Sequence, residues 1–168
     1  PSTQGEVTLN NQPVTAGNIN ELRHCFSAIF PDFFLFSEII DQQGKTADDA
    51  KVQYYLKRLA INHKVTVNNG KMSTTSLSQG QRKRLALLLV YMENRQVLLL
   101  DEWAADQDPV FREVFYREIL PELKQAGKTV IAISHDDHYF SIADRIYKLD
   151  SGKICLFDTD KHQLFATV

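Results

Sequence analysis

The stretch Val97-Leu98-Leu99-Leu100-Asp101-Glu102 is apolar over its first four residues and ends in two acids. A short, wholly apolar run predicts a strand that is buried on both faces of a parallel sheet. A parallel strand carries whatever follows it to the carboxyl edge of the sheet, where open α/β folds bind ligands. The plain alternative for such an acidic pair is that both side chains are simply solvated.

The chain around this stretch alternates between apolar strands and helical patterns. Residues 128–133 (KTVIAI) predict a second buried strand, and residues 80–93 predict a strong helix before the first strand. Between the two strands, Asp108-Pro109 begins a further helix, with Pro121 bending or breaking it. This alternation is typical of an α/β protein with a parallel sheet.

The remaining elements follow from turn residues and shorter periodic patterns. They are a β-hairpin at 5–14 around Asn10-Asn11, a helical turn at 18–23, a strand at 25–30, a loop at 31–45, a helix at 46–60 beginning at Thr46, an irregular stretch at 62–77, a helical segment at 136–143 and a hairpin at 145–157. They add antiparallel hairpins to the parallel sheet.

The composition is that of an ordinary globular chain. Hydrophobic residues make up 43% and charged residues 24% of the 168 residues, and the formal net charge of −2 does not indicate broad electrostatic capture of nucleic acid or anionic membrane. No apolar stretch reaches the ~18 residues that a membrane helix requires. Cys25 and Cys155 are expected to be reduced and buried, in a cytosolic chain. The polar start without methionine predicts a chain cut from a longer one.

Two adjacent carboxylates at a sheet edge can divide their work. One can hold a magnesium ion through water, and the other can orient or deprotonate an attacking water. His135 follows the second predicted strand at the same edge, where a histidine can donate a hydrogen bond to a terminal phosphate. His138 is expected at the surface or in a structural role, and these two histidines lack the further ligands of a metal site.

The stretch Leu77-Ser78-Gln79-Gly80-Gln81 precedes the strongest predicted helix. Ser78 is a good N-cap, and the small residues at 78 and 80 let backbone amides approach an anion at the positive end of the helix dipole. The alternative is an ordinary capped helix whose first turn, Arg82-Lys83-Arg84, is solvated.

In this order and spacing, the motifs closely resemble the nucleotide-binding domain of ATP-binding-cassette (ABC) transporters. Residues 77–81 are similar to the LSGGQ signature, residues 97–102 to Walker B with its catalytic glutamate, and His135 to the switch histidine. Ala105-Asp106-Gln107-Asp108 stands at the D-loop, where SALD is usual, and residues 30–36 (FPDFFLF) resemble the Q-loop, usually PQDPFLF in exporters.

The resemblance implies an α/β fold: a P-loop NTPase-like parallel sheet flanked by helices, truncated at the N-terminus, with a small helical subdomain and antiparallel hairpins. Residues 1–168 would be a partial ABC ATPase domain. Residues 37–92 would form the helical subdomain with the signature, and residues 1–36 and 93–168 the core subdomain.

The resemblance also implies an ATPase that uses ATP and Mg²⁺. Asp101 would hold magnesium through water, Glu102 would act as the catalytic base or polarise the water, and His135 would contact the γ-phosphate. The signature residues would close on the ATP of a second, identical domain in a homodimer: Ser78, Gln79, Gly80 and Gln81.

Further partners follow from the same resemblance. Asp108 would lie in the D-loop between the two ATP sites. A transmembrane domain, expected upstream in the same polypeptide, would be sensed near residues 33–37, and no nucleic acid is expected. The protein would work at the cytoplasmic face of the inner membrane of a bacterium.

Three departures from the family pattern are informative. Gln79 replaces the first glycine of the signature, and Pro31, beside Asp32, stands where a glutamine usually supplies a magnesium ligand and a transmembrane contact. Residues 100–109 (LDEWAADQDP) are similar to a subgroup of bacterial exporters of cyclic peptides and peptide siderophores, in which the Q-loop is also altered. Pro31 therefore does not imply a dead ATPase, and the substrate is expected to be peptide- or siderophore-like.

The phosphate-binding P-loop, GxxxxGK followed by Ser or Thr, is missing from the sequence. Gly44-Lys45-Thr46 and Gly127-Lys128-Thr129 are decoys, because Ile39 and Glu122 stand where the first glycine belongs. Residues 1–6 resemble the PxxGE segment that follows the P-loop helix. The isolated chain is therefore expected to bind ATP poorly, to be nearly inactive, and to expose apolar surface that favours self-association.

Three alternatives come from other classes of protein. A chromosome-maintenance or repair ATPase would place a long heptad coiled coil between its halves, and residues 37–77 contain none. A non-catalytic interaction module would explain Pro31 and the missing P-loop, but not why Asp101, Glu102 and His135 are all kept. A soluble translation-type tandem ATPase is disfavoured by the exporter-like FxLF segment.

Overall fold

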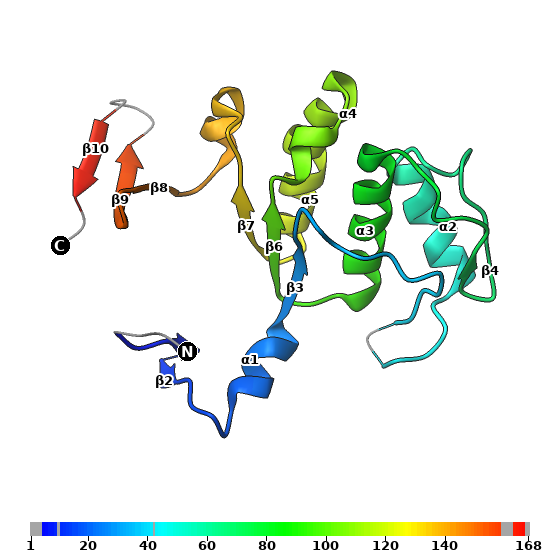
Figure 1. Ribbon diagram of the computed structural model, residues 1–168, viewed down its shortest axis with the longest axis horizontal. Coiled ribbons are helices and arrows are strands. Elements are labelled where there is room, and N and C mark those ends of the chain that lie inside the picture. The colour runs from blue at the N-terminus through cyan, green and yellow to red at the C-terminus, as the bar shows by residue number, and fades with distance from the viewer. Residues whose placement is uncertain (1–4, 10, 42, 159–162, 167–168) are drawn as a thin grey trace.

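The computed structural model describes residues 5–9, 11–41, 43–158 and 163–166, which leaves expectations for residues 1–4 and Asn10 outside the described part. Its central parallel sheet has the strand order β3 (Phe26–Ile29), β6 (Val97–Asp101) and β7 (Thr129–Ile133), as Figure 1 shows. Ile29 lies opposite Leu100, and Asp101 lies opposite Ile133, so the strands end at one edge. The α/β class and the predicted strands are confirmed.

Helices pack against this sheet on the path into β6 and on the path out of it (Figure 1). The first is α3 (Gln79–Glu93), and the second is a continuous helix of three segments: α4 (Pro109–Val114), the π-helical turn η2 (Phe115–Ile119) and α5 (Leu120–Gln125). Pro121 has no N–H to donate, and its ring would crowd the preceding turn of a regular α-helix. In η2 the N–H of Leu120 reaches back five residues to the carbonyl of Phe115, and this wider turn accommodates the proline without ending the helix.

The helices cover only one face of the sheet in the described part of the chain. In β6, Leu98 and Leu100 are buried whereas Val97 and Leu99 are half-buried, and in β7 Ile131 and Ile133 are each 47% exposed. Successive side chains of a strand point to opposite faces, so these half-buried and exposed residues share the uncovered face. The prediction of strands buried on both faces is therefore wrong, whereas the expected exposed apolar surface is present.

Beyond α3 lie α2 (Asp49–Arg58) and a hairpin of β4 (Val67–Asn68) and β5 (Lys71–Met72). The helix begins later than predicted because Asp48 caps it, accepting the N–H of Ala50 at 2.8 Å, whereas Thr46 pairs with Ile40 in a β-bridge. The hairpin lies in a stretch expected to be irregular. Its turn, Asn69-Gly70, has φ angles of 49° and 70°, both in the left-handed region that a two-residue hairpin turn requires.

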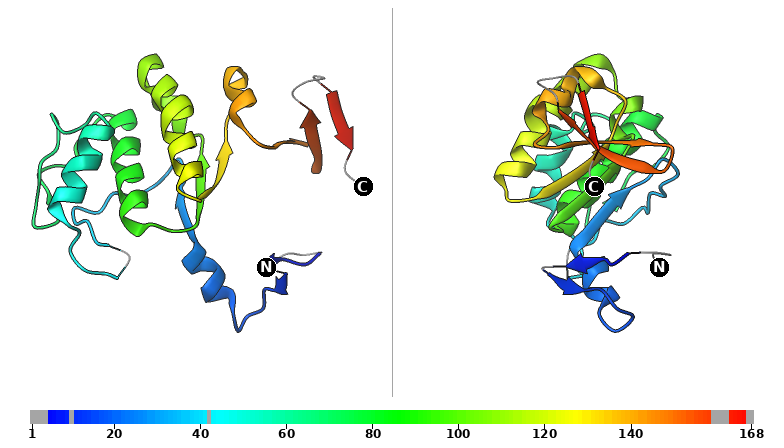
Figure 2. Two further views of the ribbon diagram at one scale, coloured as in Figure 1. Left: turned by 180° about the vertical axis from the view of Figure 1, so that it is seen from behind. Right: turned by 90° about the vertical axis from the view of Figure 1, so that its left-hand side faces the viewer.

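Two small antiparallel sheets near the ends of the chain lie apart from the central sheet, as Figure 1 and the left view of Figure 2 show. The first, predicted, is the hairpin of β1 (Thr8–Leu9) and β2 (Gln12–Pro13), followed by α1 (Ile19–Cys25). The second follows the 3₁₀ helix η3 (Asp137–Ile142) and contains β8 (Ile146–Asp150), β9 (Lys153–Asp158) and the unpredicted β10 (Gln163–Ala166).

Two further expectations concern the cysteines and the membrane. Cys25 and Cys155 are both free, as predicted, but they are half-buried rather than buried. Across the described residues, no helix combines the length and the apolar character that crossing a bilayer demands.

Candidate functional site

The polar residues that end β6 and β7 meet at the carboxyl edge of the sheet. Glu102 directly follows β6, and its backbone N–H donates to the carbonyl of Ile133, the last residue of β7, at 3.0 Å. This bond extends the parallel pairing and holds the two strand ends level. Oε1 of Glu102 then lies 3.3 Å from Nε2 of His135, with the two side chains 45% and 89% exposed. The pair is open to solvent, so an approaching water can reach the Glu102 acceptor and an approaching anionic group can reach the His135 donor.

Asp101 lies beside this pair, on the uncovered face of the sheet. It follows Leu99 by two residues, so the pleat of β6 directs both side chains to that face. Within the described ranges, no group of three or more His, Cys, Asp or Glu could form a metal cage. A single half-buried carboxylate fits Mg²⁺, which keeps several waters and takes one or two carboxylates together with substrate phosphates.

A polar network beneath the site fixes the loop that carries His135. The buried hydroxyl of Tyr116 donates to Oδ2 of Asp136 at 2.9 Å and lies 2.7 Å from Oγ of Ser134, so it contacts both neighbours of His135. Burial raises the pKa of Tyr116 to about 12, which keeps this hydroxyl protonated at neutral pH. Arg112 joins Asp136 at 3.5 Å to the carbonyl of Ala105 at 3.3 Å. No pattern in the sequence predicted this network.

The predicted N-cap of α3 is present and is reciprocal. Oγ of Ser78 accepts the N–H of Gln81 at 3.4 Å, while Oε1 of Gln81 accepts the N–H of Ser78 at 3.2 Å. This capping box fixes the backbone at the start of a fifteen-residue helix. Ser78 and Gln79 are exposed, and Gly80 is half-buried, so the positive end of the helix faces solvent.

Gly80 lies directly against the segment that follows Glu102. A Cβ atom added at Gly80 would lie 2.4 Å from the carbonyl oxygen of Asp106, so only glycine permits this approach. The amide of Gln107 donates to the Gly80 carbonyl at 3.2 Å and accepts from Nε of Arg84 at 2.8 Å. The start of α3 and residues 102–107 are therefore clamped together within one chain.

Lys83, which the alternative interpretation of the sequence placed in a solvated turn, is buried at this contact with 2% of its side chain exposed. Its Nζ donates to the Glu102 carbonyl and to Oδ2 of Asp106, both at 2.6 Å, while its own carbonyl accepts Nε1–H of Trp103 at 2.9 Å. Positions 83, 87 and 90 share one helical face, and Leu87 and Val90 are buried. That periodicity is the sequence signal that would have placed Lys83 inside.

Asp108, predicted in the D-loop, caps α4 in the structure. Its Oδ1 accepts the N–H of Phe111 at 3.0 Å, and its Oδ2 pairs with Arg84. The Phe111 N–H, and after it the Arg84 guanidinium, hold the pKa of the Asp108 carboxyl below its ordinary value.

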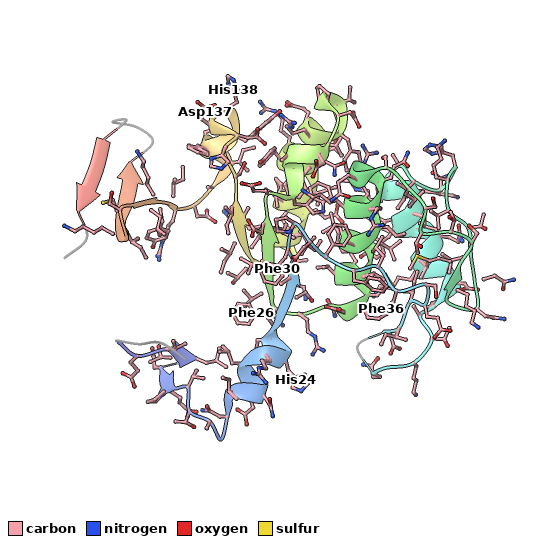
Figure 3. The ribbon with its side chains drawn as sticks, in the orientation of Figure 1. His24, Phe26, Phe30, Phe36, Asp137 and His138 are labelled. Atoms are coloured by element: carbon pink, nitrogen blue, oxygen red, sulfur yellow. The ribbon has the colours of Figure 1, made fainter. Side chains whose placement is uncertain are left out.

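Pro31 and Asp32 lie in an exposed turn after β3, near the same sheet edge. Within the described residues, no hydrogen bond or ion pair joins them to Asp101, Glu102 or His135. The loop continues into an exposed edge-to-face pair, Phe34 (73% exposed) and Phe36 (67% exposed), with ring centroids 5.0 Å apart. Figure 3 shows Phe30 at the end of β3 and Phe36 farther along this loop.

The remaining candidates lie outside the site. Figure 3 shows His138 and Asp137 projecting outward from η3, and His138 is exposed, as predicted. Neither P-loop decoy opens a helix after a strand. Residues 44–46 precede the capped start of α2, and Lys128 donates to the carbonyl of Asn94 at 3.0 Å just before β7.

The chain is similar in sequence to known proteins. Residues 1–105 match the family model described as ABC transporter. The chain is 47% identical over 154 residues to the ATP-binding protein SyrD of Pseudomonas syringae pv. syringae, covering 90% of this chain and 27% of SyrD. It therefore spans about a quarter of the length of that relative.

Solved structures share the fold. CbiO1 from Clostridium perfringens, described as part of the ABC transporter complex cbiONQ, superposes with a TM-score of 0.67 at 27% identity, over 90% of this chain and 64% of that one. A dimeric ATP-binding cassette in a post-hydrolysis state, bound to ADP and phosphate, gives a TM-score of 0.68 at 20% identity, over 90% and 72% of the two chains.

Proposed function

The chain belongs to the ABC transporter family, as part of its ATP-binding domain, and we propose on that premise that it supplies the catalytic edge of an ATPase site that drives an exporter. The observation that carries the proposal is the contact of Glu102 with His135 beside Asp101. Packing alone gives no reason for these three polar side chains to converge at one sheet edge, where open α/β folds bind their ligands.

Each of the three residues has a separate role. ATP bound with Mg²⁺ supplies the phosphoryl group and the positive charge that stabilises its transfer. Asp101 would hold the ion through water, Glu102 would orient the attacking water and accept its proton, and His135 would donate a hydrogen bond to the γ-phosphate. The Tyr116 network supports this role for His135, because it fixes the loop on both sides of the imidazole.

The signature residues act on a second copy of the domain. Ser78, Gln79, Gly80 and Gln81 present the positive end of α3 to solvent, where it would close on the ATP of the partner in a homodimer. Asp108 would lie between the two ATP sites of that dimer. The dimeric state of the solved cassette bound to ADP and phosphate supports this arrangement.

The closure of the two copies around ATP would drive a transmembrane domain carried in the same polypeptide. The exposed Phe34–Phe36 pair, next to Pro31 and Asp32, suits contact with such a domain, because adjacent exposed aromatic rings mark interaction sites. The protein then works at the cytoplasmic face of the inner membrane of a bacterium. The resemblance of residues 100–109 to exporters of cyclic peptides and siderophores supports a peptide- or siderophore-like substrate.

Residues 37–92 act as the helical subdomain, and residues 1–36 and 93–168 as the core. The chromosome-maintenance alternative is disfavoured by the ten-residue length of α2, which leaves no room for a long coiled coil before the signature. The alternative of a non-catalytic interaction module predicts no ATP binding, even by a chain extended upstream.

Calorimetry of Mg²⁺–ATP binding separates these functions. We compare the 168-residue chain with one extended upstream to include a P-loop. Binding by the extended chain alone supports the ATPase and the inactivity of the isolated chain. Micromolar, stoichiometric binding by both contradicts that inactivity, and binding by neither favours the interaction module.

The catalytic assignment is tested by Glu102→Gln in the extended polypeptide. The amide cannot accept the proton of water, so ATP should remain bound while hydrolysis is nearly abolished. Glu38→Gln is the matched control, because Glu38 is exposed and pairs only with the exposed Lys71 among the described contacts. Unchanged turnover in Glu102→Gln would refute the assignment.

A further inference from the structure

Lys83 is a charged side chain placed where a charge is costly. It projects from α3 into the interior with 2% exposure, and a buried ammonium is tolerated only when its donors are satisfied. Two acceptors lie at 2.6 Å, the backbone carbonyl of Glu102 and the carboxylate of Asp106. Asp106 supplies the compensating charge from a position 42% exposed to solvent.

The first of these acceptors belongs to a strained residue. Glu102 has φ of 47° and ψ of 34°, the left-handed conformation that side-chain-bearing residues rarely adopt. Its N–H is fixed by the Ile133 carbonyl at 3.0 Å, and its carbonyl is fixed by Lys83. With both polar groups of the peptide backbone fixed, the direction of its Cα–Cβ bond is set, and the carboxylate is aimed toward His135.

The same lysine ties Glu102 to the signature helix. Lys83 lies on α3 one turn after Gly80, whose Cα packs against the Asp106 carbonyl, and its carbonyl accepts the Trp103 indole N–H at 2.9 Å. A shift of α3 along its axis would therefore pull on residues 102, 103 and 106 together. The segment that would touch the partner's ATP and the residue that would act on the chain's own ATP are joined by one side chain.

We propose that Lys83 is a positioning residue that sets the backbone of Glu102 and couples it to the signature helix. The proposal rests on the catalytic role of Glu102 proposed above. It assigns Lys83 no contact with ATP, so its loss should slow the chemical step and leave nucleotide affinity unchanged. Asp106 holds the ammonium in place and shares this role.

The experiment uses the P-loop-containing polypeptide and compares Lys83→Met, Asp106→Asn and Asp106→Leu. Lys57→Met is the control, an exposed lysine on α2. Single-turnover hydrolysis at saturating ATP gives the rate of chemistry, calorimetry gives the ATP affinity, and a urea titration gives the stability of each variant.

Lys83→Met should lower the rate of chemistry about tenfold or more while the Kd for ATP stays within about twofold, because small misplacements of a catalytic group are costly. Asp106→Asn keeps an oxygen acceptor for Lys83 and should lower the rate of chemistry less than Asp106→Leu does. Lower stability with an unchanged rate per folded molecule would overturn the proposal, and so would equal losses of rate and affinity. If Lys83→Met does not fold, Asp106→Leu decides, since an unchanged rate there overturns the proposal equally. Failure of Glu102→Gln to abolish hydrolysis would instead refute the proposed function.

Discussion

The indole ring of Trp103 stacks on the phenyl ring of Phe115 with centroids 4.3 Å apart and an interplanar angle of 28°. Trp103 belongs to the segment that follows the candidate catalytic glutamate, and Phe115 begins the π turn of the helix behind it. Both side chains are almost fully buried. The segment after β6 is thus anchored from behind by aromatic packing and from the side by Lys83.

Trp103→Phe should destabilise the chain. It removes the hydrogen bond to the Lys83 carbonyl and part of the volume that contacts Phe115, at a cost of roughly 1–3 kcal/mol in the free energy of unfolding. Urea unfolding followed by circular dichroism measures this change. Phe36→Leu, at a position 67% exposed, is the control and should change stability by less than about 0.5 kcal/mol. Equal effects of the two substitutions would contradict the anchoring role of Trp103.

Gly80→Ala should also destabilise the chain, although alanine favours helices. The added Cβ would lie 2.4 Å from the backbone oxygen of Asp106, and neither backbone can yield cheaply, so we expect a loss of roughly 1–3 kcal/mol in the free energy of unfolding. Gly17→Ala is the control, because its Cβ would meet only the Thr15 side chain at 3.6 Å. A thermal melt in which Gly80→Ala is as stable as the parent would show that the contact with Asp106 is loose.

Asp108→Ala should cost about 1 kcal/mol in the free energy of unfolding at pH 7, the usual effect of removing a helix N-cap. The pKa of Asp108 is lowered in the folded state, so its ionised form contributes stability above the ordinary aspartate pKa of about 4. That contribution is lost as the pH falls through the lowered value.

The difference in the free energy of unfolding between the parent chain and Asp108→Ala should therefore become smaller in acid. Urea titrations at pH 7 and pH 3 measure it. Asp108→Asn, which keeps an N-cap acceptor, should lose less stability at pH 7 than Asp108→Ala. A difference in the free energy of unfolding that grows in acid would contradict a lowered pKa for Asp108 in the folded state.

The uncovered face of the central sheet should make the chain self-associate. Ile131 and Ile133 are each 47% exposed on β7, one of the two edge strands of the central sheet in the described part of the chain. Light scattering at high concentration should show association that Ile131→Lys reduces. Val110→Lys adds the same charge at a position 76% exposed on α4 and should leave association unchanged. A parent chain that stays monomeric at high concentration would disprove this expectation.

The order of the central elements was predictable because local sequence determines it. The apolar run into Asp101, the N-cap at Ser78 and the Asp108-Pro109 helix start are each specified within a few residues. How much of each strand is buried was not predictable, because that depends on which other elements cover the sheet. Ile131 and Ile133 look like core residues in the sequence and are exposed in the structure.

The site residues at the carboxyl edge of the sheet were predictable, but the side chains that hold them in place were not. Strand ends placed Glu102 and His135 together, whereas the partners of Lys83 and Tyr116 depend on how the helices pack against the ends of the sheet. The β4–β5 hairpin is a different case, since Asn69-Gly70 is a strong turn signal that the sequence did contain.

The π turn at Phe115–Ile119 fixes the angular phase of everything that follows it in the helix. Each residue of an α-helix advances by about 100°, so the residue accommodated in the wide turn rotates α5 by about that angle relative to α4. With that rotation Leu123 is buried in the core. Deleting one residue within the wide turn would restore regular helical spacing and leave Leu123 facing the core. The turn is therefore the place where the helix behind β6 and β7 can lose a single residue without rotating Leu123.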